Sequence, residues 1–279
     1  MKVGVNLFLW TGNFTKKELK LIDKVARMGF DGVELPIFDP SAVDVEATRR
    51  ALADNGLGAT VCTVIVTGSL ISSSAGERKS ALNYLSRVLE VSKAVGADVV
   101  AGPLYSPVGK LVGRGPNAAE WKHAVSGLRK LADVAEKLDI DVGVEPLNRF
   151  ETYFLNICDD AVRLCREIDS SRVGILYDTF HANIEEKDPV AALRRIPPGW
   201  LKHVHTCEND RGIPGTGHVP WEETMHALRQ MRYDRWLVIE SFVPAIKELA
   251  SAASIWRPLA RDGDDLARKG LRFLRRWAR

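Results

Sequence analysis

Four residues of the types that bind divalent metal ions stand at the ends of four consecutive strand-like segments. Each segment is a short apolar run that turns polar where the residue occurs, and the residues are Glu145, Asp178, His205 and Glu240. A carboxylate buried at a strand end is costly unless something neutralises it, and a divalent cation can do so. Three oxygen ligands and one imidazole favour Mn²⁺, with Mg²⁺ or Co²⁺ as alternatives. Taken alone, Glu145 and Asp178 could also be caps of the helices that follow them.

Strand alternation determines whether these side chains can meet. Successive side chains of a strand point to opposite faces, so His203 and His205 share one face, and so do Val238 and Glu240. We therefore expect all four strand-end residues to project inward at one rim. His203 lies one layer deeper and is expected to be a core or supporting histidine rather than a ligand. Glu34 points inward near the end of another strand, where it either supports the site through hydrogen bonds or forms part of the rim.

Two further polar residues lie close to these strand ends. His181 follows Asp178 by three residues, and Arg211 stands in a Gly- and Pro-rich loop after the strand of His205. A helix cap for His181 and a surface charge for Arg211 are the plainer alternatives. Their positions favour contacts with a substrate.

Strand and helix patterns alternate from one end of the chain to the other. Apolar runs predict strands at 3–10, 32–36, 57–66, 98–103, 141–145, 173–178, 201–206 and 236–241. Helical spacing and capping residues predict helices over 15–29, 41–54, 74–96, 117–138, 156–168, from 188 onward, 221–231 and 264–277. The Gly- and Pro-rich segment 104–116 predicts a loop over a functional face.

Eight strands in strict alternation with eight helices indicate an α/β fold with parallel strands. At 279 residues without a linker, the pattern fits one (β/α)8 TIM barrel domain spanning residues 1–279. An open, doubly wound sheet is the alternative. No Gly-x-Gly-x-x-Gly follows the first strand, so a dinucleotide site is unsupported.

The composition is that of an ordinary globular protein, with 46% hydrophobic and 27% charged residues. A net charge of +3 is too small to indicate a nucleic-acid partner, and no apolar run approaches the ~20 residues of a membrane helix. The N-terminal run does not resemble a signal peptide. Scattered cysteines without a Cys-x-x-Cys pair suit reduced thiols. We therefore expect a cytoplasmic protein that binds neither nucleic acid nor membrane.

Three sequence runs resemble the ketose 3-epimerases. They are Val-Glu-Pro-Leu-Asn-Arg-Phe-Glu (144–151), Asp-Thr-Phe-His-Ala-Asn-Ile-Glu-Glu (178–186) and His-Thr-Cys-Glu-Asn-Asp-Arg (205–211). Shorter runs at 214–221, 240–242 and 255–259 extend the similarity. These enzymes form the tagatose, psicose (allulose) and L-ribulose 3-epimerase group of the xylose-isomerase-like barrel superfamily.

The resemblance implies an isomerase of carbohydrate metabolism that epimerises a ketose at C3 with one divalent metal ion. No phosphate-cradling Gly-rich loop follows the seventh or eighth strand, which favours a free (unphosphorylated) ketose. It implies that Glu145, Asp178, His205 and Glu240 bind the metal. Glu145 and Glu240 would also be the catalytic acid/base pair on opposite faces of C3, acting through a cis-enediolate. Dimers or tetramers are common in this family, so the resemblance also implies a homo-oligomer.

On the substrate side, the resemblance implies that Glu151, His181 and Arg211 hold the O1/O2 end of the sugar. Family members often carry an aromatic residue at position 6 and a tryptophan in the loop after the fourth strand. This chain has Asn6 and no tryptophan over 104–116. Since both positions meet the far end of the sugar, the preferred ketose stays open.

Three other functions are alternatives to a ketose 3-epimerase. An aldose–ketose isomerase of the same superfamily needs the same metal but moves the proton between C1 and C2. A DNA repair nuclease on the same barrel uses a histidine-rich multi-zinc site, and the weak net charge and the few histidines at strand ends disfavour it. A non-catalytic sugar-binding protein would not need carboxylates flanking C3.

Overall fold

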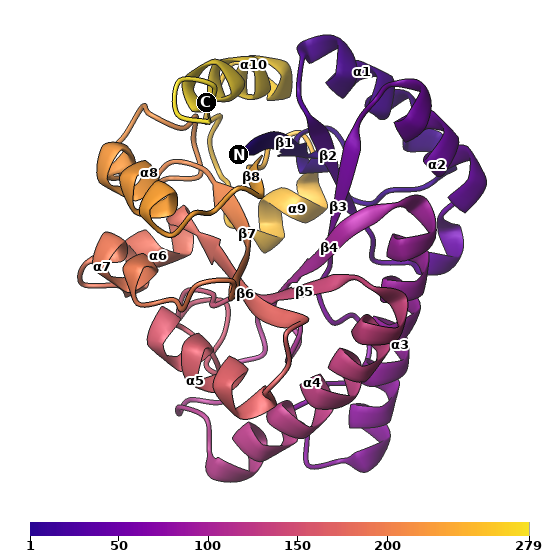
Figure 1. Cartoon of the computed structure of the whole chain (residues 1–279), viewed down its shortest axis with the longest axis vertical. Coiled ribbons are helices and arrows are strands. Elements are labelled where there is room, and N and C mark those ends of the chain that lie inside the picture. Colours follow the sequence, from indigo (N-terminus) through magenta and orange to yellow (C-terminus); the bar gives the residue numbers. More distant parts are fainter. Residues whose placement is uncertain (279) are drawn as a thin grey trace.

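The strands form a closed barrel, as Figure 1 shows. A computed structural model describes residues 1–278, in which eight parallel strands follow the chain order and β8 pairs with β1. The strands are β1 Lys2–Asn6, β2 Gly32–Pro36, β3 Gly58–Cys62, β4 Ala97–Gly102, β5 Asp141–Val144, β6 Val173–Asp178, β7 Leu201–Thr206 and β8 Trp236–Ile239. The predicted (β/α)8 barrel is confirmed, and the open sheet is excluded.

Helices connect the strands and surround the barrel (Figure 1). Over residues 1–278 there are ten α-helices: α1 Lys20–Met28, α2 Val45–Asp54, α3 Ala75–Val95, α4 Ala118–Leu138, α5 Cys158–Ile168, α6 Thr179–Glu185, α7 Pro189–Arg194, α8 Trp221–Gln230, α9 Lys247–Ala252 and α10 Gly263–Leu274. The sequence pattern predicted eight, and the two short helices α6 and α9 were missed. Helices this short carry too few residues to show a clear apolar period.

Local capping explains most of the boundaries. The Ser74 side chain accepts a hydrogen bond from the Glu77 N–H at the start of α3, and Gly96 ends that helix at a φ of 92°. Asn117 and Glu120 form a reciprocal capping box at the start of α4. Residues Leu7–Leu9 form a 3₁₀ turn, so the predicted strand over 3–10 was too long. The N–H of Phe8 donates to Asn6 Oδ1 (2.9 Å), which bends the chain away from β1.

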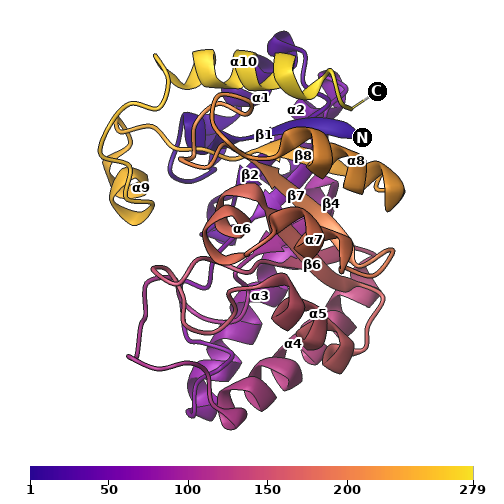
Figure 2. The same ribbon diagram turned by 90° about the vertical axis from the view of Figure 1, so that its left-hand side faces the viewer.

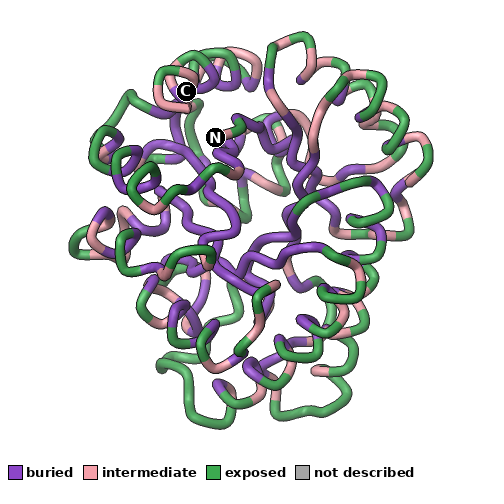
Figure 3. Tube along the Cα trace, viewed as in Figure 1, coloured by how far each residue is buried: buried purple, intermediate pink, exposed green. Residues whose placement is uncertain are grey.

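The strands are largely buried on both faces, and most of the exposed residues lie in the outer helices and loops (Figure 3). Every residue of β2, β5, β6, β7 and β8 is buried. This is the pattern expected when helices cover a parallel sheet. The main hydrophobic core lies between the barrel and its helices and includes Val33, Val61, Leu85, Leu128 and Ile175.

Both chain ends lie at one end of the barrel, and α9 lies at the other, as the side view shows (Figure 2). The end beside α9 is where the strands finish. In such barrels the strand C-terminal ends and the loops after them form the active site. We call this end of the barrel the mouth, and the predicted site residues are expected to lie there.

The opposite end of the barrel is filled by the indole of Trp236. Its ring lies against Gly32 and Gly58 on neighbouring strands, and its Nε1–H donates to Asp98 Oδ2 (3.0 Å). A Cβ at Gly32 would lie 2.3 Å from this ring and 2.6 Å from the Gly58 carbonyl oxygen. Glycine is therefore required at position 32 for packing.

Replacing Gly32 by alanine is expected to lower the free energy of unfolding by roughly 1–3 kcal/mol, the usual effect of overpacking a core. The added methyl group must displace either the indole or the backbone of β3. Thermal unfolding followed by circular dichroism measures the change. Gly76→Ala is the control, because a Cβ there meets nothing closer than 3.6 Å. Equal midpoints for wild type and Gly32→Ala would contradict the packing argument.

Candidate active site

The structure brings the four strand-end residues together at the mouth. Asp178 is the last residue of β6, His205 lies in β7, and Glu145 and Glu240 directly follow β5 and β8. One potential ligand atom from each lies within 4.8 Å of the others. All four are buried, with Glu240 the most exposed at 7%. Four strands far apart in sequence thus converge on one small polar centre.

Positive groups surround these acids. The Arg211 Nη1 donates to Asp178 Oδ2 (2.7 Å) and to Glu240 Oε2 (2.8 Å), so one guanidinium nitrogen bridges two carboxylates. The His205 Nδ1 lies 3.4 Å from Glu240 Oε2 and 3.8 Å from Glu145 Oε1. Within residues 1–278, neither His205 Nδ1 nor Glu145 Oε1 has a hydrogen-bond partner. Two buried polar atoms that face one another are thus left unsatisfied.

Burial and crowding shift the pKa values of this centre. Burial, together with the nearby charges of Glu240 and Asp178, raises the pKa of Glu145 to about 8, although His205 opposes the shift. Burial by itself would lower the pKa of His205, but Glu240 and Glu34 raise it well above its ordinary value. Without a metal ion, the centre therefore retains protons that exposed groups would lose. A divalent cation can replace this positive charge.

These shifts predict that the metal-free protein loses stability as the pH rises. The folded state holds a proton on Glu145 up to a pKa of about 8, whereas the unfolded carboxyl loses it near 4.5. The stabilisation is complete below the lower value and is lost as the pH rises through the higher one. The raised pKa of His205 acts in the same direction, whereas the lowered pKa values of His181 and His203 act in the opposite direction below about pH 7. We therefore expect the loss of stability between about pH 7 and about pH 9, above the range in which those two histidines titrate.

Thermal unfolding in chelator at several pH values measures this dependence. Glu145→Gln is the informative variant, because glutamine does not titrate and removes the contribution of Glu145. A wild-type midpoint that stays level or rises across this interval would contradict the predicted sign.

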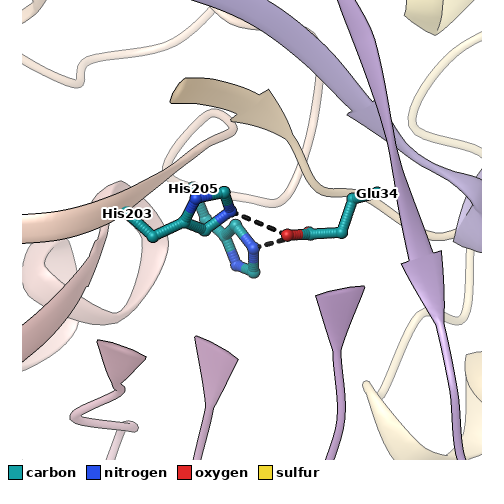
Figure 4. A group of neighbouring side chains, drawn as sticks. All are labelled: Glu34, His203 and His205. Carbon is teal, nitrogen blue, oxygen red and sulfur yellow. Dashed lines mark hydrogen bonds and ion pairs between the residues drawn. The ribbon is translucent and has the colours of Figure 1, made fainter. Parts of the chain in front are cut away.

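Below the four residues, Glu34 contacts two histidines of β7, as the close-up shows (Figure 4). Its Oε1 lies 2.8 Å from His205 Nε2, and its Oε2 lies 2.7 Å from His203 Nε2. Burial alone would raise the pKa of Glu34, but the two imidazoles lower it well below its ordinary value. Glu34 therefore contacts the site through hydrogen bonds and is not part of an exposed rim. His203 lies deeper than His205 and is fully buried.

His181 points to the same centre from α6. The Asn148 backbone N–H donates to His181 Nδ1 (3.0 Å). The other nitrogen, Nε2, lies 3.0 Å from Arg211 Nη2 and 3.8 Å from both Glu145 Oε1 and Asp178 Oδ2. Burial and the neighbouring Arg211 lower the pKa of His181 well below its ordinary value, so the ring is neutral. The Asn148 side-chain amide also donates to Glu151 Oε1 (2.7 Å). Asn148 thereby joins two of the predicted substrate residues, a role that the sequence motif alone did not indicate.

The loop that carries Arg211 is held by a buried acid, Glu208. Its carboxylate accepts hydrogen bonds from the N–H groups of Gly215 and Val219 and from Trp221 Nε1, at 2.8–2.9 Å. Arg211 itself adopts a φ of 67°, and its guanidinium stacks over the Phe180 ring at 4.1 Å. A non-glycine residue in the left-handed region needs support from its surroundings, and such residues concentrate at functional sites.

Asn6 lies next to this centre but is fully engaged within the protein. Its Nδ2 donates to Glu34 Oε1 (2.9 Å) and to Cys62 Sγ (3.2 Å), and its Oδ1 accepts from Phe8 N–H. The residue has no exposed surface. In this structure Asn6 contacts Glu34, Cys62 and Phe8, and its predicted contact with a substrate stays a prediction.

Comparisons with known proteins agree with this architecture. A family model described as xylose isomerase-like TIM barrel matches residues 22–277. A probable ketose 3-epimerase of Synechocystis sp. is 34% identical over 276 residues, covering 99% of this chain and 96% of that protein. A ketose 3-epimerase of Arthrobacter globiformis is 32% identical over 279 residues, with coverage of 99% and 96%. The chain belongs to the ketose 3-epimerases.

A solved structure supports this family assignment. The crystal structure of a D-allulose 3-epimerase from Methylomonas sp. in complex with D-allulose superposes on this chain with a TM-score of 0.93 at 28% identity. The superposition covers 99% of this chain and 97% of that one. The predicted resemblance to the ketose 3-epimerases is confirmed, and the chain is an enzyme of the isomerase class. Among residues 1–278, no helix is both long and apolar enough to cross a membrane.

Membership of the ketose 3-epimerase family implies a divalent metal ion, and the four residues at the mouth fit such an ion. Its donors are three carboxylates and one imidazole, which suit a hard or borderline cation rather than the thiolates and multiple histidines of a structural zinc site. The unsatisfied Glu145 Oε1 and His205 Nδ1 face each other where such an ion would bind. Site and family therefore agree on metal binding, while the identity of the metal belongs to the proposal below.

Proposed function

We propose that this chain epimerises a free ketose at C3, with Glu145 and Glu240 as the acid/base pair. One divalent metal ion, Mn²⁺ in preference to Mg²⁺ or Co²⁺, would be held by these two residues together with Asp178 and His205. The observation that carries the proposal is the convergence of these four buried side chains at the mouth of a barrel of this family.

The different environments of the two glutamates support the assignment of an acid and a base. In the metal-free centre, burial raises the pKa of Glu145 to about 8, so this carboxyl holds a proton more readily than an exposed one. Burial would also raise the pKa of Glu240, but His205 and Arg211 lower it below its ordinary value, so this group is ionised. Two carboxyl groups whose pKa values are pushed apart are suited to opposite roles in proton transfer.

Inversion at C3 requires two groups, because one proton leaves from one face of the carbon and another returns to the opposite face. In one direction, ionised Glu240 would abstract the C3 proton while protonated Glu145 delivers one to the other face. In the reverse direction the two residues exchange roles. A divalent ion bound at the centre would supply Lewis-acid stabilisation of the negative charge that develops on the sugar oxygens.

Three neighbouring residues would orient the O1/O2 end of the ketose. Neutral His181 presents Nε2 to the centre, because the Asn148 N–H occupies its Nδ1. Arg211 is buried and always charged, so it can donate to a carbonyl or hydroxyl oxygen. Glu151, tied to Asn148, can accept from a hydroxyl group. Asn6 would act on the sugar only indirectly, through Glu34.

Product analysis tests the proposal against the aldose–ketose isomerase alternative. The protein, loaded with Mn²⁺, is incubated in D₂O with a panel of ketopentoses and ketohexoses, and the products are identified by NMR and chromatography. Epimerase action gives psicose from fructose, with deuterium at C3. An aldose with deuterium at C1 or C2 would instead establish the isomerase. Binding of ketoses without turnover would support a sugar-binding protein.

Three expectations from the sequence stay predictions. They are a homo-oligomer (dimer or tetramer), a cytoplasmic location and a single domain over residues 1–279. We infer a free ketose as the substrate, since the relatives are named for free ketoses. Size-exclusion chromatography with light scattering measures the oligomeric state.

A further inference from the structure

Glu34 is a fully buried carboxylate that contacts four side chains on three other strands. The donors to its Oε1 are Asn6 Nδ2 (2.9 Å) and His205 Nε2 (2.8 Å). The donor to its Oε2 is Thr60 Oγ1 (2.9 Å), and His203 Nε2 lies 2.7 Å from the same oxygen without the geometry of a hydrogen bond. An ionised carboxylate has about four lone-pair sites, so three are used by hydrogen bonds and His203 crowds the fourth. Glu34 is therefore engaged within the protein on both oxygens.

The contact with His205 determines which ring nitrogen faces the metal centre. An ionised carboxylate is only an acceptor, so His205 Nε2 must carry a proton to bond with it. The other nitrogen, Nδ1, then points at Glu240 Oε2 (3.4 Å) and Glu145 Oε1 (3.8 Å). Nδ1 has no hydrogen-bond partner within residues 1–278, so it is the nitrogen that can give up its proton and bind a cation.

We propose that Glu34 is a positioning residue that holds His205 with Nε2 protonated and with Nδ1 presented to the divalent ion. This inference rests on the proposed function, because it assumes the metal centre of Glu145, Asp178, His205 and Glu240. Carboxylates that accept the second N–H of a ligating histidine fix its ring orientation and tautomer. Asn6 and Thr60 donate to Glu34 and hold it in place, which gives Asn6 a role in the site.

The contacts among Glu34, His203 and His205 can be explained without a second metal ion. Glu34, His203 and His205 could also be regarded as a two-histidine, one-carboxylate ligand group. Their N–O distances of 2.7 and 2.8 Å are hydrogen-bond lengths, whereas ligands held ~2.1 Å from one ion lie roughly 3 Å or more apart. Asn6 and Thr60 also donate to the two oxygens of the carboxylate. Hydrogen bonds account for the contacts of Glu34 with Asn6, Thr60 and His205, and His203 adds a close polar contact.

Metal affinity measured without substrate tests the proposal. Glu34→Leu removes both acceptor oxygens at similar side-chain volume, and Glu34→Gln keeps one weaker acceptor. Isothermal titration with Mn²⁺ is expected to give a Kd raised about 10–100-fold for Glu34→Leu, with a smaller increase for Glu34→Gln. Glu223→Gln, which removes a carboxylate at an exposed position of α8, is the matched control. Its Kd is expected to equal that of wild type.

NMR on ¹⁵N-labelled protein loaded with Mg²⁺ provides a signature that a merely structural role would not change. In wild type, the His205 Nε2–H is expected as a slowly exchanging, downfield imidazole resonance, because it donates to a buried carboxylate. The resonance should be lost in Glu34→Leu and shifted upfield in Glu34→Gln. Circular dichroism in chelator checks that each variant is folded. Should Glu34→Leu not fold, Glu34→Gln decides the question with both readouts.

Two outcomes would overturn the positioning role. One is wild-type Mn²⁺ affinity together with an unchanged His205 resonance in a folded Glu34 variant. The other is two Mn²⁺ ions per wild-type chain, with one lost on replacing Glu34. The proposed function fails differently: wild type would then bind one ion without epimerising any ketose at C3, and the effect of Glu34 on metal affinity would still be measurable.

Discussion

Glu145→Gln and Glu240→Gln are each expected to reduce kcat/KM for C3 epimerisation by at least about 10²–10⁴-fold, the usual contribution of a positioned acid or base. Glutamine has the shape of glutamate but cannot exchange a proton with the sugar. Both residues also face the metal centre, so the loss is expected at the upper end of this range. Steady-state assays with the preferred ketose measure the effect.

The two variants should differ in stability. Glu145 holds a proton at neutral pH because its pKa is about 8, so a neutral amide costs the fold little. Glu240 is ionised and accepts from Arg211 (2.8 Å), so Glu240→Gln leaves a buried guanidinium with a weaker partner. We therefore expect Glu240→Gln to unfold at the lower temperature. Glu223→Gln, at an exposed position of α8, is the control for both measurements.

Isotope exchange distinguishes a two-base reaction from a general loss of the site. A variant that lacks one of two bases can still remove the C3 proton from one face. In D₂O it should therefore incorporate deuterium into one C3 epimer without inverting it, provided that it binds metal. Turnover near the wild-type rate in either glutamine variant would refute the acid/base assignment.

Complete removal of divalent metal ions is expected to abolish activity, with a loss of roughly 10³-fold or more, because Lewis-acid stabilisation is worth several kcal/mol. Adding back single metals should restore turnover, best with Mn²⁺ and less with Mg²⁺ or Co²⁺. The metal content should saturate at one ion per chain. Chelation, dialysis and activity assays with each metal measure these quantities.

Metal binding should also stabilise the folded protein. Three buried carboxylates come together in this centre, and an ion that binds only the folded state stabilises it by about 2.7 kcal/mol at one hundred times its Kd. The unfolding temperature is therefore expected to rise with Mn²⁺ concentration. Asp178→Asn, which removes one carboxylate, should reduce this rise. Undiminished activity in a fully demetallated sample would refute a metal-dependent reaction.

The sequence by itself determined the architecture and the position of the site. Alternating strand and helix patterns predicted the closed barrel, because each pattern is local and the barrel follows from their regular repetition. Capping residues such as Ser74 and Asn117 identified helix starts, since a cap acts over only three residues. The strand-end positions of Glu145, Asp178, His205 and Glu240 predicted that they would meet, and the structure brings them together.

Only the tertiary structure determined the hydrogen bonds and the pKa shifts of these residues. The three donors to Glu34 come from positions 26 to 171 residues away in the chain, so no local pattern contains them. The raised pKa of Glu145 depends on burial and on charges carried by other strands. Arg211 reaches Asp178 and Glu240 only because Glu208 folds its loop over the mouth. Hydrogen-bond networks and desolvation depend on distances between strands in space, whereas the order of the strands is already present in the periodicity of the chain.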